Sequence, residues 1–164
     1  MSYAQILRVI GQTLERLSVD SFRISRVQDG FVVQELPTIE EIQSGEPQNS
    51  RPDRMNLNSR KFHYTYRDIE QLDRRESANR LEAEGLPDPE SLSNMLRAAG
   101  THVDLKGGHL IGFTKTDDKS LEIRYETDGG GVHKEMLDAA DLYSLFVRVY
   151  LKRADRSRWP MSQP

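Results

Sequence analysis

Two stretches of the chain, YAQILRVIGQTLE at residues 3–15 and LSNMLRAAGTHVD at residues 92–104, determine the expected architecture. Each spaces apolar residues three and four positions apart, which predicts an amphipathic helix. A shift of 89 residues aligns the two stretches and brings Gly11 onto Gly100. A glycine inside a helix costs about 1 kcal/mol relative to alanine, so we interpret the pair as a close approach to the equivalent helix of the other copy.

Alternating apolar and polar residues follow each of these helices. They occur at residues 22–33 and again at residues 109–127, and a shift longer by one residue keeps the segments aligned beyond their turns. Alternation on both sides of a turn predicts one β-hairpin in each copy. A third strand is expected at residues 60–65 in the first copy and at residues 132–136 in the second.

The turns of these hairpins have their own signals. Asp29-Gly30 is expected to supply the positive φ of the first turn, and Asp117-Asp118-Lys119 forms the second. The triple glycine at residues 129–131 leads into a strand, so it lacks the helix N-terminus that holds a phosphate group. We interpret it as a hairpin turn, and no recognised catalytic or nucleotide-binding motif occurs elsewhere in the sequence.

Each copy is expected to end in a helix. Thr65 with Asp68, and Asp138 with Asp141, have the three-residue spacing of a capping box. The predicted fold class is therefore α+β, an internally duplicated α-β-β-β-α module with antiparallel strands and helices packed on one face.

The domain boundaries follow from this repeat. The first copy covers residues 1–84 with a long loop at 37–59, the linker covers 85–90, the second copy covers 91–153, and a flexible tail covers 154–164. Two prolines in the linker prevent a helix from running through it. A hairpin with one further strand is barely stable alone in water, so we expect the copies to fold as one unit.

The composition limits the function classes. The chain has 164 residues, a net charge of −3 and no cysteine, which excludes thiol nucleophiles, disulfides and thiolate metal sites. The chain has no signal-peptide pattern and no apolar run of about 18 residues, so we expect a cytoplasmic protein without a membrane partner. No cofactor or metal is expected.

The C-terminal helix carries the first functional hypothesis. One apolar stripe suits the core, and a second is available to a partner. We predict a non-enzymatic, adaptor-like or chaperone-like protein that binds another protein, or a second copy of itself, through this helix and a mobile loop or tail. The candidate contact residues are Tyr143, Val147, Arg148, Tyr150, Leu151, Lys152 and Trp159. In outline, a small acidic protein with helices on antiparallel strands resembles the type III secretion chaperones, through architecture and without a shared motif.

Two alternatives stay open. Cations interleave with aromatic residues at residues 60–67, which is typical of a surface that binds single-stranded nucleic acid; its candidate residues are Arg60, Lys61, Tyr64, Tyr66 and Arg67. The third hypothesis is a small enzyme in which imidazole and carboxylate groups act together. Its candidate residues are His102, Asp104, His109 and His133.

Overall fold

The structure is a computed structural model, and it describes residues 1–37, 60–79, 91–116, 121–138, 140–145 and 147–148. Most of the predicted loop 37–59, the linker and the tail lie outside these residues. Among the helices described, none has the length and apolar character needed to span a membrane.

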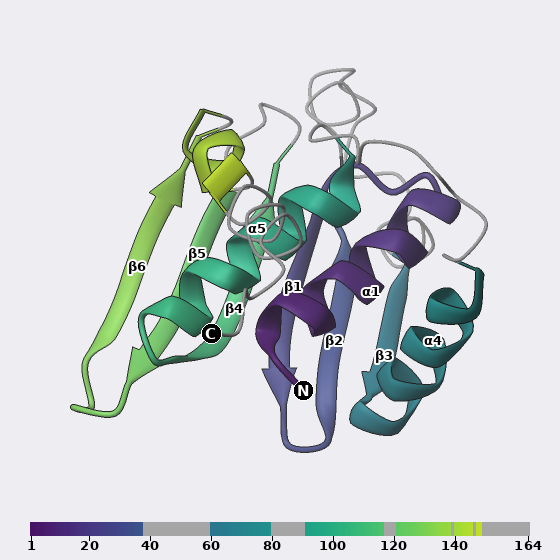
Figure 1. The fold of residues 1–164 in the computed structure, drawn as a ribbon, viewed down its shortest axis with the longest axis horizontal. Helices are drawn as coiled ribbons and strands as arrows, with labels where there is room; N and C mark the ends of the chain where they lie inside the picture. The colour runs from purple at the N-terminus through teal and green to yellow at the C-terminus, as the bar shows by residue number, and fades with distance from the viewer. Residues whose placement is uncertain (38–59, 80–90, 117–120, 139, 146, 149–164) are drawn as a thin grey trace, which may run out of the picture.

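Six antiparallel strands form a single sheet in the order β3-β2-β1-β4-β5-β6 (Figure 1). The helices are α1 (Tyr3–Arg16), α4 (Tyr66–Asn79) and α5 (Leu92–Leu105), and residues 140–145 and 147–148 are also helical. The strands are β1 (Phe22–Val27), β2 (Gly30–Glu35), β3 (Lys61–Thr65), β4 (Gly108–Lys115), β5 (Leu121–Thr127) and β6 (Val132–Leu137).

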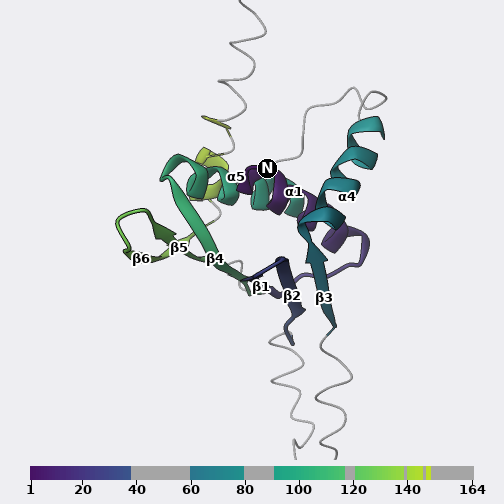
Figure 2. The same cartoon turned by 90° about the horizontal axis from the view of Figure 1, so that it is seen from below.

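The helices lie on one face of the sheet, as Figure 2 shows. The predicted α+β class, with antiparallel strands and helices on one face, is therefore confirmed. The core fills the space between the two layers. Its largest fully buried side chains are Phe22, Phe31, Phe113, Leu7, Ile10, Leu14, Ile24, Ile69, Leu96, Leu110, Leu121 and Ile123.

Helices α1 and α5 touch through their glycines. A Cβ atom added at Gly11 would lie 2.6 Å from the Cα of Ser93, and one added at Gly100 would lie 2.4 Å from the carbonyl oxygen of Tyr3. Real Cβ atoms do not approach other atoms so closely. The predicted close approach of each glycine to the other helix is confirmed.

Each of these helices is capped by a carboxylate from the other. Asp104 accepts hydrogen bonds from the backbone N–H groups of Tyr3 and Ala4, both at 3.0 Å. Glu15 accepts one from the backbone N–H of Ser93, also at 3.0 Å. First-turn N–H groups have no partner inside their own helix, so these carboxylates satisfy donors that would otherwise need water.

The two halves of the chain are also joined through their central strands, β1 and β4. Ile24 on β1 pairs directly with Phe113 on β4, and these two residues are matched by the 89-residue shift. The order of elements also repeats, since a helix, three strands and a helix follow each other twice. The two halves are thus arranged with approximate two-fold symmetry, while their origin by duplication stays a prediction.

The first hairpin turn differs from the prediction. Val27 pairs with Gly30, so Gln28 and Asp29 form the turn, and Gly30 does not have a positive φ. A Cβ atom at Gly30 would lie 2.0 Å from the carbonyl oxygen of Tyr64 on β3. The expectation of a positive-φ glycine was wrong, because close approach of the neighbouring strand, and not the turn, requires glycine here.

Candidate functional site

The C-terminal helical segment, residues 140–145 and 147–148, begins at the predicted cap. Asp138 accepts a hydrogen bond from the backbone N–H of Asp141 at 2.7 Å, and its own N–H donates to the Asp141 carboxylate at 3.2 Å. Thr65 and Asp68 form the same reciprocal pair at the start of α4, with bonds of 2.9 and 3.1 Å. Both predicted capping boxes are confirmed.

The segment buries residues of one predicted stripe, while Tyr143 and Val147 are the described residues of the other. Leu142 is buried and Leu145 packs partly against the core. The side chain of Tyr143, in contrast, is 57% exposed, Val147 is half-buried and Arg148 is exposed. The remaining candidate contact residues, Tyr150, Leu151, Lys152 and Trp159, lie outside the described residues.

A cavity of about 520 Å³ lies between this segment and the C-terminal end of α5. Leu105, at its rim, is 70% exposed. Among the described residues, the cations Lys106 and Arg148 line the cavity together with one carboxylate, that of Asp141. Its full lining is His102, Leu105, Lys106, Leu137, Asp141, Ser144, Leu145 and Arg148.

His102, which lines the cavity, belongs to a hydrogen-bonded polar cluster with Tyr125 and Glu135. The Nε2 of His102 lies 2.7 Å from one oxygen of Glu135, and the hydroxyl of Tyr125 donates to the other at 2.5 Å. The hydrogen bond to Glu135, together with burial, raises the pKa of Tyr125 to about 12. The same hydrogen bond, and a weaker contribution from His102, lower the pKa of the Glu135 carboxyl although burial opposes this.

Two of the candidate enzymatic residues meet at one ring, because His102 packs edge-to-face with Tyr125 with centroids 6.2 Å apart and His133 contacts the same ring. The other two take separate partners. Asp104 caps α1, and His109 lies 3.2 Å from the exposed carboxylate of Asp128. His133 stacks on the ring of Tyr125, with centroids 5.1 Å apart. Within the described part of the chain, no group of three or more His, Cys, Asp or Glu side chains is placed to hold a metal ion.

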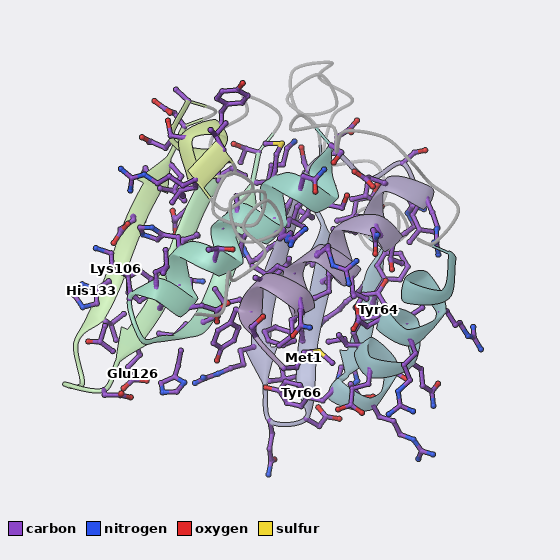
Figure 3. The ribbon with its side chains drawn as sticks, in the orientation of Figure 1. Met1, Tyr64, Tyr66, Lys106, Glu126 and His133 are labelled. Atoms are coloured by element: carbon purple, nitrogen blue, oxygen red, sulfur yellow. The ribbon has the colours of Figure 1, made fainter. Side chains whose placement is uncertain are left out.

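The candidate nucleic-acid residues are divided between surfaces. Figure 3 shows Tyr64 on the helix side, beside α1 and α4. Burial raises the pKa of Tyr64, opposed by its hydrogen bond with Thr13 of α1. Lys61, one strand position from the half-buried Phe62, projects to the opposite side of the sheet.

The other members of that set are held in different ways. Arg60 donates to the Glu35 carboxylate at 2.7 Å and to the Leu17 carbonyl at 3.1 Å, and the hydrogen bond lowers the pKa of Glu35. Tyr66 is partly exposed, and its ring packs edge-to-face with that of Phe31, with centroids 5.8 Å apart. Arg67 is exposed on α4. The segment therefore does not present its aromatic rings and cations on one face.

The Glu135 cluster makes stability depend on pH. A carboxyl whose pKa is lowered by folding contributes stability that is present above its unfolded pKa and is lost as the pH falls through the folded value. Glu135→Gln is expected to lower the free energy of unfolding by about 1–2 kcal/mol at neutral pH, because a hydrogen bond to a charged group is weakened. The deficit relative to wild type should shrink below pH 4.5, the ordinary pKa of this group. Urea unfolding of both proteins across this range tests the expectation, and a deficit that does not change with pH would contradict it.

Sequence reasoning missed Leu105 and the Tyr125–Glu135 pair. Leu105 follows the last position of the apolar stripe on α5, and its exposure depends on where the C-terminal segment packs. Tyr125 and Glu135 look like ordinary strand residues in sequence, and only the pairing of β5 with β6 brings them together with His102. In comparisons with known proteins, no family model, no curated protein and no solved structure matches this chain.

Proposed function

We propose that the protein binds another protein through the outer face of the C-terminal helical segment. The observation that carries the proposal is the contrast between neighbouring residues, since Leu142 is buried in the core while Tyr143 is 57% exposed. Tyrosine and arginine are enriched among residues that contribute most to protein interfaces, and Tyr143 and Arg148 are both exposed here. From the sequence, Tyr150, Leu151, Lys152 and Trp159 are predicted to contact the same partner.

The cavity beside the segment indicates the chemistry of the partner. Leu105 offers an apolar rim, and Lys106 and Arg148 outnumber the carboxylate of Asp141. A partner segment with apolar side chains next to acidic ones complements this arrangement. The alternatives receive less support. Asp104 and His109 take other partners than His102 and His133, which share Tyr125, and the aromatic rings of residues 60–67 do not share a face with the cations.

A peptide selection tests the proposal. Random peptides displayed on phage are selected on the full-length protein, and enriched peptides are expected to combine apolar residues with Asp or Glu. Tyr143→Asp should weaken their binding at least about tenfold, as expected for an aromatic contact residue. Arg148→Glu should weaken the most acidic of them, because it reverses the charge that attracts them.

The matched control is Met136→Asp on β6, since Met136 is 59% exposed and lies outside the segment. This variant should bind the selected peptides as wild type does. The proposal would be contradicted if the selected peptides bind the Tyr143→Asp variant as tightly as wild type, or if the selection enriches no peptide. A dimer seen by light scattering that dissociates on Tyr143→Asp would show that a second copy occupies the face instead.

A further inference from the structure

The face of the sheet opposite the helices is uncovered by any helix among the described residues (Figure 2). Strand pairing fixes which side chains share this face, because alternate residues point to the same side. The first row across the sheet is Lys61, Gln34, Arg23, Thr114, Glu122 and Met136, and the second is His63, Val32, Ser25, Gly112, Arg124 and Lys134.

Four cations in these two rows form a band that runs from one edge strand of the sheet to the other. Lys61 lies on β3, Arg23 on β1, Arg124 on β5 and Lys134 on β6. Five gaps between strands at about 4.8 Å give the band a length of about 24 Å, and two rows on one face give it a width of only about 7 Å. The band therefore has the shape of a single extended polymer chain.

The charges of the band are only partly balanced. Glu122 is the one carboxylate in the two rows, and its oxygens lie 3.1 Å from the Lys134 amine and 3.7 Å from the Arg124 guanidinium. Arg23 and Lys61 are exposed and have no ion pair within the described ranges. The two rows therefore carry a net positive charge, whereas the net charge of the whole chain is −3.

The floor of the band consists of small and polar residues. A Cβ atom at Gly112 would lie 3.2 Å from Nη2 of Arg124, so the glycine leaves room for the guanidinium beside β4. Ser25 and Thr114 on either side offer hydroxyl donors. Among the described residues, these two rows contain no Phe, Tyr or Trp and no large apolar patch, unlike the core of a protein interface.

We propose that this band binds the phosphate backbone of single-stranded nucleic acid without regard to base sequence. Arginine, lysine, serine, threonine and glutamine are the side chains that contact phosphates, and these residue types dominate the band. Without aromatic rings for base stacking, affinity comes from the electrostatic term alone, which does not distinguish bases. The proposal uses Lys61 but none of the aromatic residues of segment 60–67, and it does not rest on the C-terminal segment.

The test is fluorescence anisotropy of a labelled oligothymidylate with the full-length protein over a series of salt concentrations. The logarithm of the binding constant is expected to fall against the logarithm of salt with a slope of about −3, because four contacts contribute about 0.7 each. The double variant Arg23→Gln, Lys61→Gln should halve this slope. Oligonucleotides of other base composition should bind with the same affinity as oligothymidylate. The Tyr143→Asp variant should bind oligothymidylate with the wild-type affinity.

The matched control is the double variant Arg67→Gln, Arg75→Gln, which removes two exposed cations from α4. It should keep the wild-type slope, whereas equal losses in both double variants would indicate a general charge effect and overturn the proposal. Absence of binding at low salt would also overturn it. Poly-glutamate that binds with the same dependence on Arg23 and Lys61 would assign the band to acidic peptides instead.

Discussion

Residues 1–84, expressed without the second half, are expected to remain unfolded. In the whole protein, β1 pairs with β4 on one side and α1 packs on α5, so both central elements of the first half lose a neighbouring element. Three strands and two helices would then carry the exposed side chains of Ile24 and Leu7, which are fully buried in the intact chain. A half-sheet with so small a core does not offset the conformational entropy of its chain.

Circular dichroism and amide chemical-shift dispersion of the isolated half measure this expectation. Residues 85–164 should behave in the same way when alone. Mixing the two fragments should restore helical signal and a cooperative melt, because each supplies the partner strand and helix that the other lacks. A cooperative melt of either fragment by itself would show that the halves are independent domains that happen to touch.

Gly100→Leu is expected to lower the free energy of unfolding by about 3 kcal/mol or more. Leucine has a better helix propensity than glycine by up to about 1 kcal/mol, so the sign depends on the contact across the interface. There the new Cβ would lie 2.4 Å from the Tyr3 carbonyl oxygen, and the obstacle is backbone that cannot rotate away. Chemical denaturation at equilibrium measures the loss.

Gly129→Leu is the control for this substitution. No atom lies within 4 Å of a Cβ at Gly129, and its φ is not in the left-handed region. Its free energy of unfolding should stay within about 0.5 kcal/mol of the wild-type value, as for most surface changes. Equal free energies of unfolding for the Gly100 and Gly129 variants would mean that α1 and α5 do not approach each other as described.

The local features of the fold could be predicted from the sequence, and the features that join the halves mostly could not. The caps at Thr65 and Asp138 depend on residues three positions apart, and these were confirmed. Gly11 and Gly100 were informative because each occupies a costly position in a helix. The pairing of β1 with β4 has no such signal, because any strand edge left free in one half is a candidate partner for the other.

The candidate site was predictable to the same degree. The two stripes of the C-terminal helix follow from spacing alone, and the structure buries Leu142 as that spacing predicts. The cavity depends on how this helix packs against Leu105 of α5, which is a tertiary contact. The band on the uncovered face depends on strand register, since Arg23 and Lys61 are 38 positions apart in sequence and share a row only through Gln34.

The reciprocal caps of α1 and α5 also constrain how the protein can change over evolutionary time. Glu15 and Asp104 each stand in the last turn of one helix and serve the first turn of the other. Inserting or deleting a residue in either helix would rotate its carboxylate by about 100° and move it away from the donors. The connections between strands are free of this requirement, as the different spans between β2 and β3 and between β5 and β6 illustrate. Length variation is therefore tolerated in the loops and excluded from the paired helices.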